Sequence, residues 1–195
     1  MKANIKSILL APLLLLASLF TMTSCDSFIA TSLEGTWSGD MYMYSEWSGH
    51  RYNITSCDIE FIGDPFSMHS GTGYWVDYYS GAPWDYMAYH IRWTVENRVI
   101  KIRFLEDNYY VEIRDYNLED RRFYGNVYYD GDHKYFELYH TSSPNWDNMH
   151  YGYDYGYDYG YGYGPYYSPS RSAVSDSVPA AEAPAAPVRH MRLDD

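Results

Sequence analysis

The sequence predicts an all-β fold in which eight antiparallel strands follow one another as an up-and-down meander. Between Leu33 and His140, apolar and polar residues alternate in eight short runs, which is the pattern of strands that bury one face. Short connections rich in turn-forming residues separate these runs. No stretch in this range shows the apolar period of a helix.

The individual strands are defined by their alternating faces. In the clearest run, Tyr89, Ile91 and Trp93 share one face and the residues between them are polar. The other runs follow the same rule, and the predicted strands span about residues 35–44, 52–62, 67–78, 89–95, 100–104, 109–114, 123–129 and 134–140. Two glycines inside the third run, Gly71 and Gly73, predict a bulge or a sharp bend there.

The short connections predict that consecutive strands pair as antiparallel neighbours. Because no helix is predicted to cover the apolar face, that face is buried either in a closed barrel or in a two-layer β-sandwich. The first strands are longer than the usual five or six residues, which favours the barrel. The sandwich remains the alternative.

The first 25 residues have the pattern of an export signal. Two lysines precede an apolar block from Ile8 to Phe20, which has the length of a secretory core and is too short for a typical membrane-spanning helix. Thr23 and Ser24 stand directly before Cys25, and this arrangement resembles the lipobox of bacterial lipoproteins. The resemblance implies that residues 1–24 are a signal peptide and that Cys25 becomes the acylated N-terminus.

Acylation of Cys25 predicts a membrane anchor without a spanning helix. Each buried CH₂ of an acyl chain such as palmitate contributes about 0.8 kcal/mol, and two chains hold a protein stably. Residues 25–32 then form a short tether. We expect the chain in the bacterial cell envelope, with the outer membrane or the cell surface favoured.

A second resemblance concerns Gly35-Thr36-Trp37 at the start of the first predicted strand. It is similar to the G-x-W motif that opens lipocalin-type barrels, in which the tryptophan plugs the closed end. The predicted eight-stranded meander is also similar to that family. The resemblance implies a lipocalin-like barrel over residues 33–143.

The composition changes completely beyond His140. Tyrosine occupies every odd position from Tyr151 to Tyr163, and glycine at this density predicts disorder across the Tyr/Gly-rich residues 144–167. In an extended strand these tyrosines would share one face and could stack on sugars or aromatic rings. The Pro/Ala-rich residues 168–195 predict an extended, unstructured tail.

Charge and motifs exclude several classes of function. The formal net charge of −12 at pH 7 makes nucleic acid an unsuitable partner. The histidines are scattered and no cysteine pair is available, so the sequence predicts neither a metal site nor a cofactor. Cys57 alternates with polar residues and is expected to be a buried, inert thiol. Asp58 and Glu60 could form a catalytic pair, but a solvated strand face is favoured, and the sequence predicts no enzyme.

Two hypotheses for function remain. In the first, the barrel binds a small hydrophobic or aromatic ligand, because eight strands enclose space for one small molecule. The predicted ligand-binding residues are Trp37, Met41, Ile59, Tyr89, Trp93 and Phe104. In the second, the barrel is a filled scaffold, and exposed Trp47, Trp84 and Trp146 together with the tyrosine tract contact envelope polysaccharide or a partner protein.

Overall fold

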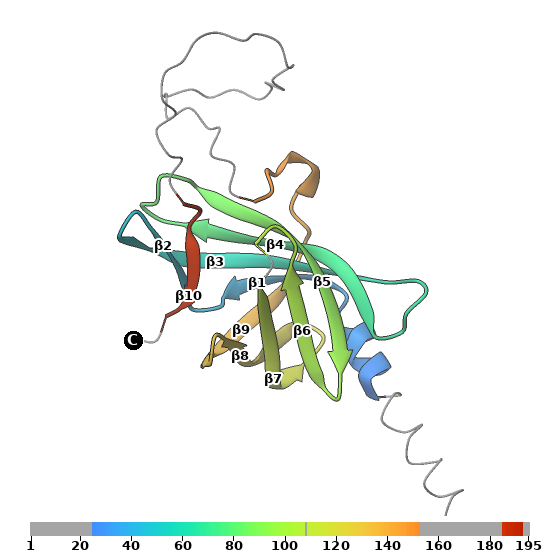
Figure 1. Cartoon of the computed structure of the whole chain (residues 1–195). Helices are drawn as coiled ribbons and strands as arrows, with labels where there is room; N and C mark the ends of the chain where they lie inside the picture. Colours follow the sequence, from blue (N-terminus) through green and yellow to red (C-terminus); the bar gives the residue numbers. More distant parts are fainter. Residues whose placement is uncertain (1–24, 108, 153–184, 193–195) are drawn as a thin grey trace, which may run out of the picture.

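The computed structural model describes residues 25–107, 109–152 and 185–192, and these form a closed antiparallel β-barrel (Figure 1). The strands of the ring are β1 (Gly35–Asp40), β3 (His50–Gly63), β4 (Ser70–Tyr79), β5 (Tyr86–Glu96), β6 (Val99–Phe104), β7 (Tyr110–Leu118), β8 (Arg122–Tyr129) and β9 (Asp132–Thr141). Strands β3 to β9 pair consecutively, and β1 closes the ring by pairing with both β9 and β3. The predicted eight-stranded meander barrel is confirmed.

The first predicted strand is interrupted, and its second half leaves the ring. Tyr42 has a φ of 54°, and its N–H donates to the Asp40 carboxylate at 2.6 Å. Strand β2 (Met43–Trp47) continues along β3 without a partner from β9. Its other edge pairs with β10 (Val188–Met191), near the end of the chain (Figure 1). The prediction of an unstructured tail is therefore wrong for these residues.

One end of the barrel is covered by a helix at residues 25–33, coloured blue in Figure 1. Ala30 and Leu33 are buried in the barrel core. The Asp26 carboxylate accepts the backbone N–H groups of Asn97 and Arg98 in the β5–β6 turn, each at 2.9 Å. Residues 25–32, which the sequence predicted to be a short tether, are helical, and the short apolar face of this helix packs against the barrel. We call this end the covered end.

Trp37 lies at the covered end, as the G-x-W resemblance implied. Its indole N–H donates to the Leu33 carbonyl at 2.8 Å. Its ring contacts Phe123 edge to face, with 5.7 Å between ring centroids. The side chain is 1% exposed. Trp37 therefore joins the helix to the floor of the barrel.

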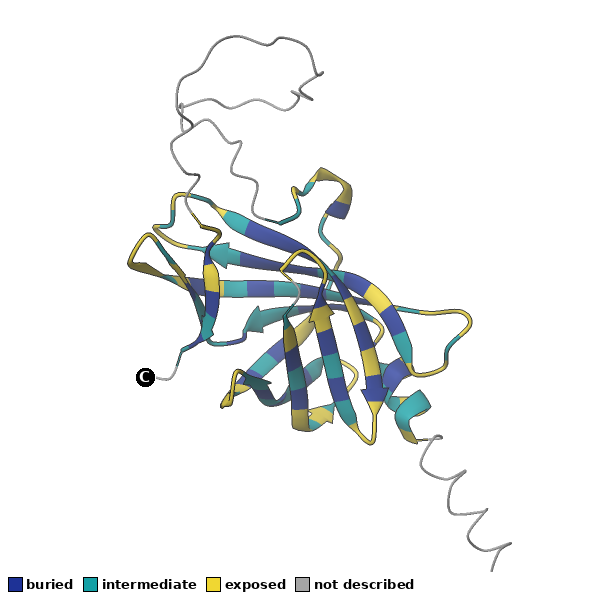
Figure 2. Cartoon of the chain, in the orientation of Figure 1, coloured by how far each residue is buried: buried dark blue, intermediate teal, exposed yellow. Residues whose placement is uncertain are grey.

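The interior of the barrel is built from alternating residues of every strand, so that buried and exposed positions succeed each other along the ribbons (Figure 2). The predicted bulge at Gly71 and Gly73 is absent, because the β3–β4 register is continuous from Ser56 to Gly63, and the irregularity lies between Ile54 and Ser56. The two glycines instead allow close packing. A Cβ atom on Gly71 would lie 2.0 Å from the carbonyl oxygen of Ile62.

Some sequence predictions fall outside the described residues. The signal peptide (1–24) and most of the Tyr/Gly-rich segment are among these. Tyr151 is described, and its ring lies 3.9 Å from that of His90. No helix within the described ranges is long and apolar enough to cross a membrane.

Candidate binding site inside the barrel

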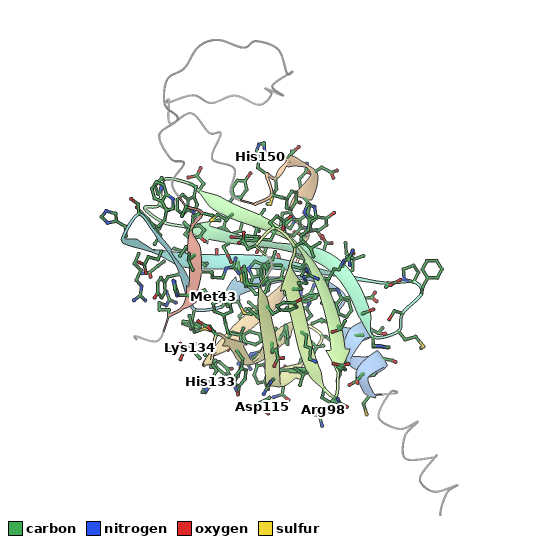
Figure 3. The ribbon with its side chains drawn as sticks, in the orientation of Figure 1. Met43, Arg98, Asp115, His133, Lys134 and His150 are labelled. Carbon is green, nitrogen blue, oxygen red and sulfur yellow. The ribbon has the colours of Figure 1, made fainter. Side chains whose placement is uncertain are left out.

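Arg189 of β10 points into the end of the barrel opposite the helix, which we call the mouth. Residues alternate along β10, so Arg189 and Met191 are buried and Val188 is exposed. The strand pairs with β2 in a register that sets Arg189 opposite Ser45 and Met191 opposite Met43. Figure 3 labels Met43 beside this strand. Its sulfur accepts a long contact of 3.9 Å from the Arg189 guanidinium.

The guanidinium of Arg189 meets a buried carboxylate. Asp77 on β4 is 1% exposed and Arg189 is 4% exposed. The Asp77 carboxylate accepts a hydrogen bond from Nη2 of Arg189 and another from the indole N–H of Trp75, the latter at 2.7 Å. Two charges removed from water in this way depend on each other, because either one alone would be buried without a partner.

Four aromatic rings surround the same guanidinium. Its carbon lies 4.6 Å from the ring centroid of Phe104, 4.8 Å from Tyr89, 5.0 Å from Tyr109 and 5.6 Å from Trp75. These distances are within the range of cation–π attraction. The rings also hold one another, since Phe104 and Tyr109 stack at 4.2 Å and Tyr89 meets Phe104 edge to face at 5.4 Å. We call Asp77 and these four aromatic residues the cation cage.

The electrostatics of the cage follow from its burial. Burial raises the pKa of the Asp77 carboxyl, and the nearby Arg189 and the Trp75 N–H offset this only in part. Burial also raises the pKa of Tyr89 and of Tyr109 well above the usual value, although Arg189 acts in the opposite direction. Both phenols therefore stay neutral at physiological pH. Asp107, in the β6–β7 connection, interacts electrostatically with Arg189 as well.

Two buried polar groups of the site have no hydrogen-bond partner among the described residues. They are the hydroxyl of Tyr109 and the Nε–H of Arg189. A buried donor or acceptor without a partner is unfavourable. Arg189 therefore occupies the cage without using all of its polar groups.

The six predicted ligand-binding residues are all buried in the barrel core. Tyr89 and Phe104 belong to the cation cage. Trp37 and Trp93 lie instead near the helix, where the Trp93 indole N–H donates to the Thr72 carbonyl at 2.8 Å. The other two, Met41 and Ile59, belong to the core and not to the cation cage.

Sequence reasoning missed Trp75, Asp77, Tyr109 and Arg189. A signal for two of them was present, because Trp75 and Asp77 are two residues apart and so share a strand face. An acidic residue on an apolar face indicates a buried charge. No comparable signal marked Arg189, which lies in a Pro/Ala-rich tail.

The polar and reactive residues considered from the sequence lie outside the cage. Asp58 and Glu60 are half-buried on the outer face of β3, where they accept hydrogen bonds from Tyr78 at 3.1 Å and from Ser143 at 2.8 Å. Cys57 is a buried free thiol, and burial raises its pKa well above the usual value. In the part of the chain that the structure describes, no group of three or more His, Cys, Asp or Glu residues is placed to hold a metal ion.

The prediction of three exposed tryptophans is wrong. Trp47 and Trp84 are half-buried and pack edge to face, with ring centroids 5.6 Å apart. Trp146 is 8% exposed and stacks on Tyr74 at 5.0 Å. These side chains stabilise the outside of the barrel and leave little ring surface for a partner.

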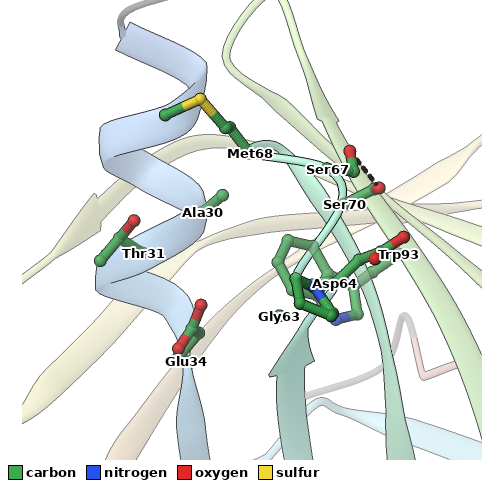
Figure 4. A pocket seen from close by; sticks show the side chains of 10 residues that line it. Ala30, Thr31, Glu34, Gly63, Asp64, Ser67, Met68, Ser70 and Trp93 are labelled. Atoms are coloured by element: carbon green, nitrogen blue, oxygen red, sulfur yellow. Dashed lines mark hydrogen bonds between the residues drawn. The ribbon is translucent and has the colours of Figure 1, made fainter.

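A small cavity of about 160 Å³ lies at the covered end, between the helix and the β3–β4 connection (Figure 4). Ala30, Thr31 and Glu34 line it from the helix side, and Met68 points toward the helix across it. Ser70 donates a hydrogen bond to Ser67 at 2.7 Å on the far wall. This cavity is separate from the cation cage.

Comparison with known proteins supports the fold. Residues 33–125 match the family model described as a lipocalin-like domain. No curated protein and no solved structure matches the chain. The matched range contains all five residues of the cation cage, whereas β9, β10 and therefore Arg189 lie beyond it.

Proposed function

We propose that this lipocalin-like barrel is a non-enzymatic binding protein, held on a bacterial envelope membrane by acylated Cys25, and that its ligand enters the mouth and occupies the cation cage. One observation carries the proposal. The interior already accepts an inserted group, Arg189, from a segment that follows the barrel in the chain. The family match supports a small-molecule site in the same place, because barrels of this size enclose room for one small ligand.

The inserted segment is not part of the eight-stranded ring. Strand β10 has four residues and pairs with β2 alone. Departure of β10 would vacate the cage and leave the eight-stranded ring intact. The aromatic walls then suit a ligand with an apolar or aromatic body.

The position of Cys25 supports the anchoring part of the proposal. Cys25 is exposed and is the first described residue, on the helix at residues 25–33. Three exposed apolar side chains lie at the same end, on the helix and on the adjoining β3–β4 connection. They are Phe28 (73% exposed), Phe66 (96%) and Met68 (77%), which we call the apolar rim. An acylated Cys25 would turn the covered end toward the membrane and the mouth away from it.

Anchoring is tested on the full chain expressed in a bacterial host. We expect mass spectrometry to find a mature chain that starts at Cys25 and carries acyl chains, and membrane fractions to contain it. Cys25→Ser is the matched variant and should not be acylated. A mature chain that begins at another residue, or that lacks acyl mass, would refute the anchor.

Ligand binding is tested by native mass spectrometry of the mature chain before and after mild organic extraction. The same measurement is made on a truncated chain that ends at residue 184 and therefore lacks β10. Near-ultraviolet circular dichroism verifies that the truncated chain is folded. We expect the truncated chain to carry an extra mass that extraction removes. A bare polypeptide mass in both proteins, also after incubation with fatty acids and small aromatic compounds, would contradict the proposed site.

A further inference from the structure

We infer that the barrel selects a ligand that carries a guanidinium or a quaternary ammonium group, and that this cation takes the place of Arg189. The inference rests on the proposed function, because it names the chemical class of the ligand for the same site. Arg189 itself indicates what the site accepts. Its charged group lies within 5.6 Å of the centroids of all four rings.

Asp77 is the first reason that a cation is required. The carboxylate belongs to β4, in the middle of the barrel wall, so it stays buried when β10 leaves. Its only other hydrogen bond described here comes from the Trp75 indole. A neutral ligand that displaced Arg189 would leave this carboxylate buried without a counter-charge, which is strongly unfavourable.

The rings are the second reason, and they restrict the type of cation. Phe104, Tyr89 and Tyr109 all lie within 5.0 Å of the guanidinium carbon. Aromatic cages of this kind bind quaternary ammonium groups, whose charge is spread over an apolar surface. A guanidinium is also weakly hydrated, whereas a primary ammonium holds its water strongly. We therefore expect guanidinium and quaternary ammonium compounds to bind more tightly than primary amines.

The unsatisfied polar groups indicate that Arg189 is an imperfect occupant. The Tyr109 hydroxyl and the Nε–H of Arg189 are both buried, and neither has a hydrogen-bond partner within the described residues. A free ligand that satisfies the Tyr109 hydroxyl would make an interaction that Arg189 does not make. Arg189 nevertheless has the advantage of a tethered competitor, whose effective concentration reaches the millimolar range.

The experiment removes the tethered cation and offers free ones. Arg189→Ala in the mature chain keeps β10 but empties the cage. Isothermal titration calorimetry then compares choline with its neutral carbon isostere 3,3-dimethylbutanol, and ethylguanidinium with its neutral isostere ethylurea. We expect each cation to bind the variant at least tenfold more tightly than its neutral isostere, and ethylammonium to bind more weakly than ethylguanidinium. The wild-type chain should bind both cations at least tenfold more weakly than Arg189→Ala.

A second variant ties the selectivity to the carboxylate. In Arg189→Ala combined with Asp77→Asn, the preference for choline over its isostere should fall by about tenfold or more. Equal binding of charged and neutral probes to Arg189→Ala would overturn the inference and leave the proposed function standing. Absence of any binding, together with a bare polypeptide mass in the native spectra, would remove both.

A cleaved form keeps the test decisive if Arg189→Ala does not fold. A protease site placed between residues 153 and 184 converts the C-terminal segment into a separate peptide. The cleaved barrel should bind a synthetic peptide of residues 185–195 at least tenfold more tightly than the same peptide with neutral citrulline at position 189. Equal affinities of the two peptides would contradict the inference.

Discussion

The guanidinium of Arg189 donates a hydrogen bond to the carboxylate of Asp77, although the two residues are 112 positions apart in the chain. Their surroundings differ in one respect. Asp77 lies on β4, which is paired on both sides, with β3 and with β5. Arg189 lies on a four-residue strand that has one partner. Removing the charge of Asp77 and removing the charge of Arg189 should therefore destabilise the protein to different extents.

Arg189→Gln should destabilise the protein more than Asp77→Asn. The first change leaves a carboxylate that cannot leave the barrel, and we expect a loss of about 3 kcal/mol in the free energy of unfolding. After Asp77→Asn, β10 can detach and return Arg189 to water, so the loss should stay near about 1–2 kcal/mol. Urea unfolding at pH 7 measures both values, and hydrogen exchange at residues 188–191 reports whether β10 is released.

The double variant and the pH dependence serve as controls for this pair. Asp77→Asn combined with Arg189→Gln should recover most of the loss caused by Arg189→Gln alone. In Arg189→Gln, burial keeps the pKa of Asp77 above 3.8, its ordinary value. Stability should therefore fall as the pH rises above that value. Equal losses in the two single variants, with β10 still protected, would contradict the asymmetry.

The regular part of the barrel could be predicted because its information is local. Tyr89, Ile91 and Trp93 alternate with polar residues, and this alternation reports directly which strand face is buried. The helix at residues 25–33 was missed because Ala30 and Leu33 form too short an apolar face to show a helical period. The helix is stabilised by packing Ala30 and Leu33 against the end of the barrel.

The centre of the candidate site depends on pairing between distant residues, which no local pattern reports. Arg189 stands among prolines and alanines, and a charged residue in such a tail normally remains in water. Only Asp77 and the four rings make its burial favourable. Asp77 itself was visible as an acid on the face of Trp75, but its partner could not be identified without the fold. The interior position of Tyr89 and Phe104 could be predicted, because the alternation of apolar and polar residues along their strands shows which side chains are buried.

Glu137 on β9 should make stability depend on acid pH. Both of its oxygens accept hydrogen bonds from Arg122 on β8, at 2.7 and 2.8 Å, and its Oε1 also accepts one from Tyr139. These bonds, chiefly those from Arg122, lower the pKa of Glu137 from 4.5 to about 2. The stabilisation is present above the unfolded-state pKa and is lost as the pH falls from about 4.5 to about 2.

Glu137→Gln should flatten this dependence. Free energies of unfolding between pH 2 and 6 would show a smaller slope in the variant than in the wild-type protein. Glu46→Gln on β2 removes the same charge at an exposed position and serves as the control. A wild-type slope retained in Glu137→Gln would rule out this carboxyl as its source.

Gly71 and Gly63 face each other across β3 and β4, but they should respond differently to an added methyl group. At Gly71 a Cβ atom would meet the backbone carbonyl of Ile62 at 2.0 Å and the Trp93 ring at 2.6 Å. At Gly63 it would meet the flexible carboxylate of Glu34. Gly71→Ala should cost about 2–4 kcal/mol, and Gly63→Ala less than about 1 kcal/mol. Urea unfolding compares the two, and equal losses would show that the strand tolerates the clash.

The apolar rim should contribute to membrane attachment beyond the acyl chains. Phe28, Phe66 and Met68 expose most of their surface at the same end of the barrel as Cys25, the residue that would be acylated. Apolar area removed from water contributes about 25 cal/mol per Å², so three such side chains would add to an anchor that is marginal with one acyl chain. We expect the combined variant Phe28→Ser, Phe66→Ser and Met68→Ser to weaken binding to phosphatidylcholine vesicles by about tenfold or more.

This experiment is best done with the unlipidated Cys25→Ser chain, because the acyl chains would hide a moderate change. Vesicle sedimentation gives the partition coefficient of each protein. Tyr135→Ser is a matched control, since Tyr135 is 48% exposed and lies on β9 toward the mouth. Its partition coefficient should equal that of the parent chain if the covered end faces the lipid. Equal effects of the rim and control substitutions would show that the bilayer does not distinguish the two ends, and the proposed orientation would then be wrong.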